Sequence, residues 1–237
     1  MKTTPKYTIV EDYLINRINT GELKVGDQIE TEEQLAELFG YSRMTINKAL
    51  NRLVEKKQIT RISGKGSFVS SSHVTKSLES QSSFTEDMKS IGLLPGSKLL
   101  TYELIKSNEI PMISKKLNLK ENVFVHHFVR LRTGNGTPIA ISYNYVSTEV
   151  LPAINVEALN HSFYDFLKTL GYTVLGSELE MEAVLPTTEQ KKLLQIDQGA
   201  LLKSKAITTV SFDGKESILG YFETFYNGNI YTYKFNK

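Results

Sequence analysis

The sequence has no cysteine among its 237 residues. That absence excludes disulfide bonds, thiolate nucleophiles and thiolate zinc sites, and it is typical of proteins in a reducing cytoplasm. No apolar run approaches the roughly 18 residues that a membrane-spanning helix needs. Acidic residues follow the first apolar side chains too soon for the apolar core of a signal peptide. We therefore expect a cytoplasmic protein without a membrane segment.

A strong excess of charge of one sign is also missing, since 28 basic and 26 acidic side chains give a net charge of only +2. Averaged over the chain, this value gives no indication of a nucleic-acid partner. The excess is concentrated, however, in residues 42–69, where Glu55 is the only acid. The basic residues of this segment are Arg43, Lys48, Arg52, Lys56, Lys57, Arg61 and Lys65. The pattern predicts a local anion-binding face, and a solvated helix surface is the alternative that the charges alone leave open.

Serine is abundant in one short stretch, and the character of the chain changes there. Half of the residues in 70–83 are serine, so this stretch can bury little surface. It separates a part with helical patterning from a part rich in strand-forming residues. Together with the chain length, this predicts an N-terminal domain of residues 1–70, a linker over 71–81 and a C-terminal domain of residues 82–237.

Three helices are expected in the N-terminal domain. Apolar residues recur at helical spacing over residues 7–18. Residues 31–34 fit a capping box at the start of a second helix, and Gly40 can end that helix with a positive φ. Ser42 can then cap a third helix. Two helices joined by so short a turn cross steeply, as in a helix-turn-helix.

A β-hairpin is expected directly after the third helix. Polar and apolar side chains alternate over residues 59–62, and a second strand follows over residues 66–69. The tip between them contains Gly64, Lys65 and Gly66, and its glycines allow a tight, exposed turn. Such a tip is narrow enough to approach a minor groove or a phosphate.

The start of the third helix carries donors suited to the major groove of DNA. Arg43 can bond O6 and N7 of guanine together, Asn47 can pair with adenine, and Thr45 can bond a phosphate or contact a thymine methyl group. The residues expected at DNA are Thr31, Ser42, Arg43, Thr45, Asn47, Lys48, Arg52, Arg61, Gly64, Lys65 and Gly66.

Helix, turn and hairpin together match one known pattern. It comprises Glu32-x-x-Leu35-Ala36-x-x-Phe39-Gly40-x-Ser42-Arg43-x-Thr45 and then Gly64-Lys65-Gly66-Ser67-Phe68-Val69. These motifs closely resemble the winged helix-turn-helix of GntR-type transcriptional regulators. The resemblance implies a homodimer on an inverted-repeat operator in double-stranded DNA, with the third helix in the major groove and the wing in the minor groove. Glu33 and Asn47 depart from the family, where arginine is common, and Lys57 stands in place of a glycine.

Strand-forming residues dominate the C-terminal domain. Strands are expected over 98–106, 122–133, 137–147, 172–185, 200–211 and 216–226, with tight turns at 134–136 and 213–214. Short helices are expected over 84–91, 111–118, 162–170 and 187–195. This order predicts an α+β fold with an antiparallel sheet.

Two parts of the C-terminal domain look alike. Residues 115–146 can be laid over residues 191–225 at an offset of about 77 residues, which indicates duplication of a helix–hairpin unit. Arg130 and Arg132 of the first copy then correspond to Ile207 and about Thr209 of the second. Because strands have a period of two, both arginines lie on one face, where they favour a bidentate anion such as phosphate or carboxylate. A solvated strand face is the alternative.

Two predicted helix starts, at Ser83 and Ser162, could serve the same anion through their free amides and hydroxyl groups. Taken singly, these serines could equally be simple N-caps.

A second resemblance rests on several stretches of the C-terminal domain. They are Ser83-Phe84-Thr85-Glu86-Asp87-Met88, Arg130-Leu131-Arg132, Pro138-Ile139-Ala140, Ser162-Phe163-Tyr164 and Tyr226-x-Gly228-x-x-Tyr231. They resemble the UTRA effector domain of the HutC subgroup, which has a chorismate-lyase-like fold. The resemblance implies a phosphate site at Ser83, Thr85, Arg130, Arg132 and Ser162, with Phe84 and Tyr164 beside it. Ser142 and Glu223 match positions where acids hold the sugar, and Ser142 and Asn229 depart from the family pattern.

The sequence shows no set of residues for catalysis. His126 and His127 are adjacent in a predicted strand, so they point to opposite faces and cannot share a metal. Glu178, Glu180 and Glu182 alternate along one strand face, which favours a solvated edge over an acid/base set. No zinc-protease, Walker or nucleophile-elbow motif occurs. We expect no catalytic residue, metal or cofactor.

Together these patterns predict a homodimeric, ligand-responsive repressor. A small anionic metabolite, in first place a sugar phosphate, is expected to release it from its operator. Two other classes stay open on the sequence. One is a metabolite-processing enzyme with an accessory DNA-binding domain, and the other is an architectural DNA-binding protein whose second domain only dimerises.

Overall fold

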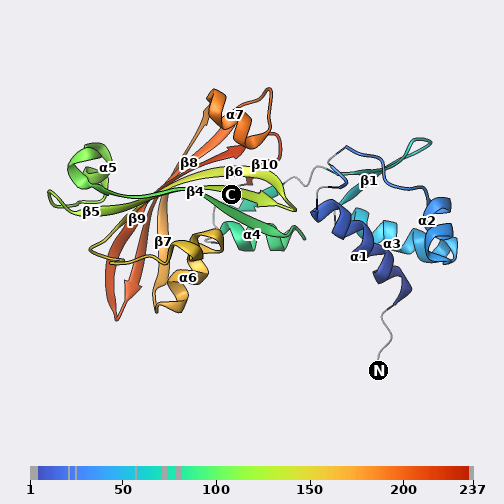
Figure 1. The fold of residues 1–237 in the computed structure, drawn as a ribbon, viewed down its shortest axis with the longest axis horizontal. Helices are drawn as coiled ribbons and strands as arrows, with labels where there is room; N and C mark the ends of the chain where they lie inside the picture. Colours follow the sequence, from blue (N-terminus) through green and yellow to red (C-terminus); the bar gives the residue numbers. More distant parts are fainter. Residues whose placement is uncertain are drawn as a thin grey trace.

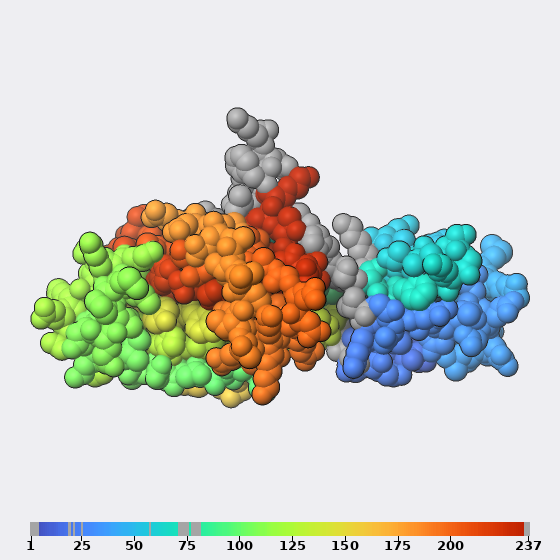
Figure 2. All heavy atoms as spheres, turned by 90° about the horizontal axis from the view of Figure 1, so that it is seen from above, coloured from blue at the N-terminus to red at the C-terminus, as the bar shows by residue number. Residues whose placement is uncertain are grey.

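The structure is a computed structural model of the chain, and it describes residues 5–20, 22–24, 26–56, 58–70, 74–77 and 82–234. Figures 1 and 2 show two lobes: the N-terminal domain, coloured blue to cyan, and the C-terminal domain, coloured green to red. Among the described residues, no helix is both long and apolar enough to cross a membrane.

The N-terminal domain is a three-helix unit with a small hairpin. It consists of α1 (Lys6–Asn19), α2 (Glu32–Phe39), α3 (Arg43–Glu55), β1 (Ile59–Ile62) and β2 (Gly66–Val69). The strands β1 and β2 pair antiparallel. One core cluster joins all five elements, and its fully buried members include Val10, Leu14, Leu35, Ile46, Ala49, Leu53 and Ile59. The predicted helix-turn-helix followed by a hairpin wing is therefore confirmed.

Short-range hydrogen bonds set the helix boundaries in this domain. The Gln34 amide donates to Thr31 Oγ1 at 3.2 Å, and the Thr31 amide donates to Gln34 Oε1 at 2.9 Å, which completes the predicted capping box. Gly40 ends α2 with a φ of 63°, and Ser42 caps α3 by accepting from the Thr45 amide. These contacts fix the turn between α2 and α3.

The tip of the wing depends on a glycine. Gly66 has a φ of 118°, and a Cβ at this position would lie 2.5 Å from Gln28 Nε2. That same nitrogen donates to the Lys65 carbonyl oxygen at 3.0 Å. Only glycine combines this backbone conformation with so close an approach.

The C-terminal domain is built on one six-stranded sheet. Its strands are β4 (Pro95–Lys106), β5 (Phe124–Gly134), β6 (Thr137–Ser147), β7 (Thr173–Val184), β8 (Leu201–Phe212) and β9 (Lys215–Asn227). They run in the order β4-β5-β6-β9-β8-β7, and every neighbouring pair is antiparallel. The predicted α+β fold with an antiparallel sheet is confirmed.

Short helices cover both faces of this sheet. In Figure 1, α4 (Phe84–Ser90) and α6 (Phe163–Thr169) lie on one side, and α5 (Pro111–Lys116) and α7 (Thr188–Leu194) lie on the other. The 3-10 helices are η1 (Ser107–Glu109) and η2 (Val156–Asn160). Phe128 packs edge-on against Phe163 on the α6 side, whereas Ile141 shares a core cluster with Leu194 on the α7 side.

A strand lies within the segment that the sequence predicts to be a linker. Residues 71–73 and 78–81 are outside the described residues, but β3 (Val74–Ser77) between them pairs in parallel with β10 (Tyr231–Lys234). The connection between the domains is thus tied in part to the C-terminal domain. Its valine and threonine favour strand formation despite the surrounding serines.

Candidate functional site

Several residues predicted to bind DNA lie on the exposed face of α3 and at the tip of the wing. The exposed face of α3 forms a shallow hollow lined by Met44, Asn47, Lys48, Asn51, Arg52 and Glu55. Lys65 is exposed at the tip of the wing, between two glycines. The structure therefore has a helix and, directly after it in the sequence, a hairpin, and both expose polar or basic side chains to solvent.

Arg43 at the start of α3 is held by an acid of α2. Its guanidinium donates to Glu33 Oε1 at 2.5 Å, and both side chains are 71% exposed. An exposed ion pair of this kind contributes little to stability, so the Arg43 guanidinium can leave Glu33 for another acceptor at little energetic cost. Glu33, which departs from the family pattern, is therefore the immediate neighbour of the residue predicted to bond guanine.

Asn47 belongs to a closed ring of side chains that sequence reasoning did not anticipate. Its Nδ2 donates to Glu32 Oε1 at 2.9 Å, and its Oδ1 accepts from Asn51 at 2.9 Å. Arg61 of the wing closes the ring by donating to Asn51 Oδ1 at 2.7 Å and pairing with Glu32. The ring joins the wing to α3, so Asn47 has a structural partner in addition to any role at DNA.

The basic side chains farther along α3 are anchored by α1. Lys48 Nζ lies 4.3 Å from the centre of the Tyr7 ring. Glu11, only 2% exposed, pairs with Arg52 and with Lys56, whose Nζ lies 2.6 Å from Glu11 Oε2. The Glu11 hydrogen bond raises the pKa of Arg52. These contacts hold three cations on one side of α3.

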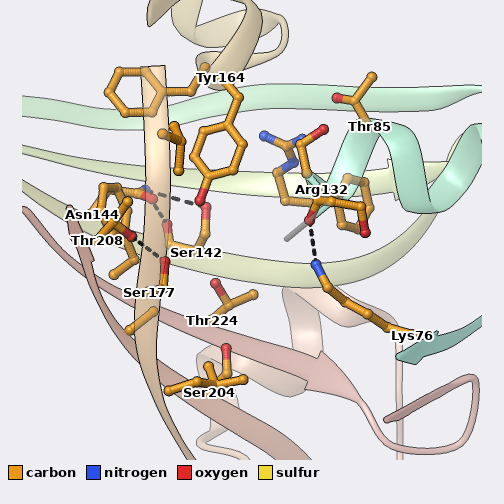
Figure 3. Close-up of a pocket in the computed structure, with 18 of the residues that line it drawn as sticks. Lys76, Thr85, Arg132, Ser142, Asn144, Tyr164, Ser177, Ser204, Thr208 and Thr224 are labelled. Atoms are coloured by element: carbon orange, nitrogen blue, oxygen red, sulfur yellow. Dashed lines mark hydrogen bonds between the residues drawn. The ribbon is translucent and has the colours of Figure 1, made fainter. Parts of the chain in front are cut away.

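A pocket of about 280 Å³ lies in the C-terminal domain, on the sheet face that α4 and α6 cover. Figure 3 shows the side chains around it. Its lining includes Lys76, Ser83, Phe84, Thr85, Arg130, Arg132, Ser142, Asn144, Ser162, Tyr164, Ser177, Ser204, Thr208 and Thr224.

Two buried arginines form the charged part of the pocket. Arg130 and Arg132 are each 5% exposed, and neither makes an ion pair with a described acid. Among the described residues, Nε of each has no hydrogen-bond partner, and the one bond of Arg130 is a long one of 3.4 Å to the His161 carbonyl. Burial lowers the pKa of Arg130 well below its usual value, with repulsion from Arg132 adding to the effect. Burial also lowers the pKa of Arg132, to about 10.

Aromatic rings rather than acids surround these arginines. The Arg132 guanidinium lies 4.6 Å from the centre of the Phe84 ring. That of Arg130 lies 5.3 Å from Phe128 and 5.7 Å from Phe163. The ring faces attract the cations and exclude water, but they do not neutralise the charge. Two buried cations without an acidic partner among the described residues favour the binding of an anion here.

Ser83 and Ser162 are helix N-caps that also line the pocket. Ser83 Oγ accepts from the Glu86 amide and Ser162 Oγ accepts from the Asp165 amide, each at 3.2 Å. Both are therefore N-caps, and both line the pocket together with the hydroxyl groups of Thr85 and Tyr164. Each serine keeps its O–H to donate to a ligand.

The far wall of the pocket is neutral and rich in hydroxyl groups. It is formed by Ser142, Asn144, Ser177, Thr208 and Thr224 (Figure 3). Asn144 Nδ2 donates to the Phe128 carbonyl at 2.8 Å, so the other end of this amide group is its oxygen, which can accept a hydrogen bond. No acid is among the described residues that line the pocket. Alternation along β6, β8 and β9 would have indicated this wall from the sequence.

Glu223 does not line the pocket, in contrast to the other predicted effector residues. It accepts from the Tyr221 hydroxyl at 2.8 Å and lies 3.2 Å from Lys203 Nζ on the opposite face of the sheet. Its neighbour Thr224 faces the pocket instead. Since successive strand residues point to opposite faces, a shift of one position in the sequence match accounts for the difference.

The same one-residue shift applies to the internal repeat. The order α5-β5-β6 recurs as α7-β8-β9, as the duplication predicts. On β8, however, Ala206 and Thr208 face the pocket, rather than Ile207 and Thr209. The offset of 77 residues fits the starts of α5 and α7 and of β5 and β8, but the pocket-facing side chains of β8 are displaced by one residue from it.

Lys76 is the cationic residue that sequence reasoning missed among the described residues lining the pocket. It lies on β3, within the segment predicted to be a linker, and its side chain is 13% exposed. The alternation of polar and strand-forming residues in Val74-Thr75-Lys76 was the only available signal.

The two histidines and two of the three glutamates considered for catalysis have structural partners. His126 bonds to Tyr102 and to the Leu151 carbonyl, and His127 bonds to Glu103 from the other face of its strand. Glu180 and Glu182 pair with lysines of β8. Within the described part of the chain, no cluster of metal-ligating side chains occurs.

Comparison with known proteins supports both halves of this description. Residues 6–69 match the family described as bacterial regulatory proteins, gntR family, and residues 90–232 match the UTRA domain. The HTH-type transcriptional repressor NagR of Bacillus subtilis is 32% identical over 97% of this chain and 93% of its own length. The mannosyl-D-glycerate transport/metabolism system repressor MngR of Escherichia coli is 28% identical over 89% and 88%. The crystal structure of PhnF from Mycobacterium smegmatis has a TM-score of 0.64 at 19% identity and covers 96% of this chain and 98% of its own.

Proposed function

The chain belongs to the GntR family of bacterial transcriptional regulators, in its HutC subgroup with a UTRA domain, and from this premise we propose its mode of action. The protein acts in the cytoplasm as a homodimeric repressor. It binds an inverted-repeat operator in double-stranded DNA and releases the operator when a sugar phosphate enters the pocket of the C-terminal domain.

The observation that carries this proposal is the pair of arginines, Arg130 and Arg132, which are buried with no acidic partner in the described part of the chain. A protein does not retain two unpaired buried cations for stability, because each costs desolvation energy. A phosphate monoester carries up to two negative charges at neutral pH and offers three oxygens, so it satisfies both guanidinium groups together. Ser83, Thr85 and Ser162 supply the remaining donors at the pocket mouth.

The rest of the ligand meets a neutral wall. Ser142, Asn144 and Thr224 offer hydroxyl and amide groups, and no described lining residue offers a carboxylate. Such a wall suits the hydroxyl groups of a sugar and gives no countercharge to an ammonium group. NagR is named as a transcriptional repressor, and MngR is named as the repressor of a system for mannosyl-D-glycerate, a sugar derivative. By analogy with MngR, we propose a sugar-derived effector for this chain.

The DNA-binding half supports the operator part of the proposal. Arg43 is exposed at the start of α3, and Lys65 is exposed at the tip of the wing. A helix in the major groove and a hairpin in the minor groove would use these two positions. Two copies related by a two-fold axis require two half-sites in inverted orientation, with a spacing set by the dimer.

A selection experiment followed by a ligand screen tests the proposal. The full chain would first select its operator from random double-stranded DNA. A panel of sugar phosphates and the matching unphosphorylated sugars would then be titrated into the complex. We expect release by at least one phosphorylated sugar and none by its unphosphorylated counterpart. Arg130→Gln should bind the operator but no longer respond.

Three outcomes would contradict this proposal. Turnover of a ligand by the full chain would favour an enzyme. Operator binding that no anion changes, together with dimerisation through the C-terminal domain, would favour an architectural protein. A single half-site in the selected DNA would contradict the homodimer on an inverted repeat.

A further inference from the structure

Lys76 is set apart from the two arginines by its place in the chain. Arg130 and Arg132 lie on β5 in the interior of the sheet, whereas Lys76 lies on β3, only six residues after Ser70 of the N-terminal domain. The Ser70 amide donates to the Gln58 carbonyl at 2.9 Å, so Ser70 is itself part of the N-terminal domain. Among the described residues that line the pocket, Lys76 is the cation nearest in sequence to the DNA-binding domain.

The ammonium group of Lys76 is held by internal partners in the present structure. It lies 3.0 Å from Asp87 Oδ2 and donates to the Ser82 carbonyl at 2.5 Å. Asp87 is 7% exposed and also accepts from the Ser82 hydroxyl at 2.5 Å and from the Tyr231 hydroxyl at 3.1 Å. One carboxylate thus binds β3, α4 and β10 together.

The charges around the pocket leave a defined excess. Lys76, Arg130 and Arg132 are three cations, and Asp87 is the one described acid paired with any of them. Counted over these four groups, three positive charges and one negative charge leave +2, and Glu86 acts on Lys76 only at longer range, without an ion pair. A dianion, such as a phosphate monoester, neutralises that excess, whereas a monoanion does not. Figure 3 shows the Lys76 side chain reaching into the pocket on the side of Arg132.

Apart from the Lys76–Asp87 ion pair, the strand that carries Lys76 is held by a short backbone pairing. β3 has four residues, and it pairs with the four-residue strand β10, with Lys76 opposite Tyr233. Two-stranded sheets of this length have little stability of their own, so an added contact to a ligand changes how firmly β3 is held. A ligand contact to β5 cannot do the same, because β5 is already paired on both sides in the sheet.

We propose that Lys76 is a third anion-binding residue of the pocket, and that its contact with a dianionic ligand holds β3 in place and so transmits ligand binding to the N-terminal domain. This inference rests on the proposed function, since it needs an anion in the pocket. In this proposal, Arg130 and Arg132 bind the anion. Lys76 connects the occupied pocket to the segment that leads to the DNA-binding domain.

The test compares Lys76→Gln with wild type in the full chain, using inorganic phosphate as the probe. Glutamine keeps hydrogen-bond donors for Asp87 and Ser82 but removes the charge. Lys215→Gln, at the exposed first residue of β9, removes the same charge away from the pocket. Calorimetric titration should show phosphate binding about tenfold weaker in Lys76→Gln and unchanged in Lys215→Gln, as expected for loss of one charged hydrogen bond.

Hydrogen exchange of the β3 and β10 amides supplies the second measurement. Saturating phosphate should slow exchange of these amides in wild type and in Lys215→Gln. In Lys76→Gln, phosphate at saturation should occupy the pocket through the arginines and leave β3 exchange unchanged. Sulfate, a dianion, should act as phosphate does, and acetate, a monoanion, should not.

The outcomes separate this inference from the function on which it rests. Equal phosphate affinity and equal slowing of β3 exchange in wild type and Lys76→Gln would overturn the role of Lys76 while leaving the pocket in place. Failure of wild type to bind phosphate, sulfate or any sugar phosphate would overturn the proposed function itself. Lys76→Arg keeps the charge and should restore binding, and loss of binding in that variant as well would show that Lys76 acts only through packing with Asp87.

Discussion

Gln58 of the N-terminal domain lies against Asn135 of the C-terminal domain, with Asn135 Nδ2 donating to Gln58 Oε1 at 3.4 Å. Gln58 also donates from Nε2 to the Gly92 carbonyl, at 3.2 Å, and is only 2% exposed. Asn135 occupies the turn between β5 and β6, three residues after Arg132. The two domains are therefore in direct contact at the turn that follows β5, the strand that carries Arg130 and Arg132.

Replacing Gln58 by alanine should loosen the arrangement of the two domains. The change leaves the Gly92 carbonyl and the Asn135 amide without a partner, which costs about 1–3 kcal/mol when such groups stay buried. We expect a lower free energy of unfolding in chemical denaturation and a broader distribution of domain distances in small-angle scattering. Gln198→Ala, at an exposed position, serves as the control. Identical scattering curves for Gln58→Ala and wild type would show that the contact does not orient the domains.

Replacing Arg130 by methionine should stabilise the ligand-free protein while abolishing its response to anions. Arg130 is buried beside a second cation and has one long hydrogen bond, so the substitution removes a desolvation cost. Exchanges of buried charges for apolar side chains of similar size often stabilise by about 1–4 kcal/mol. Denaturation with and without phosphate measures both effects. A less stable variant would mean that the guanidinium is satisfied in the free protein.

The sequence predicted the order and type of nearly every element because its signals were local. The capping box at Thr31, the turn at Asn135 and the alternation along β5 each specify their own conformation within a few residues. Arg130 and Arg132 were placed correctly on one strand face because a period of two requires no knowledge of distant contacts.

The parts that failed depended on register or on distant partners. Glu223 was assigned to the pocket, but a shift of one residue along β9 turns it to the other face. Lys76 was placed in a linker because its strand is formed only by pairing with β10, more than a hundred residues later. The ring that links Asn47 to Arg61 through Glu32 likewise requires three separate elements to fold together.

Replacing Arg43 by alanine should weaken binding to the selected operator by about 1–3 kcal/mol and relax selection at one base position. The exposed guanidinium is held only by Glu33, and exchanging that acceptor for a guanine costs little. Competition binding with operators altered one base pair at a time measures both effects. Unchanged affinity for the operator would mean that α3 enters the groove through another part of its surface.

Replacing Lys65 by alanine should have a different effect, because the wing tip offers a charge without a base-reading geometry. Operator and unrelated DNA should lose affinity by similar factors. The slope of log affinity against log salt concentration should fall by about one, as one phosphate contact is lost. Filter-binding titrations over a range of salt concentrations provide the measurement. Loss of affinity confined to the operator would instead assign Lys65 to base recognition.

His126 should make the stability of the C-terminal domain depend on pH. Its Nε2 donates to the Leu151 carbonyl and its Nδ1 shares a hydrogen bond with the Tyr102 hydroxyl, each at 2.9 Å. Burial lowers the pKa of His126 below 6.5, the usual value that it regains on unfolding. The unfolded chain therefore binds more protons below that pH, and the free energy of unfolding falls as the pH drops through it, by at most about 1.4 kcal/mol per unit. His126→Gln should be less stable than wild type at neutral pH, since it loses these bonds, and should show a smaller decline on acidification. Denaturation series at several pH values measure the two slopes, and parallel slopes would place the acid sensitivity in other groups.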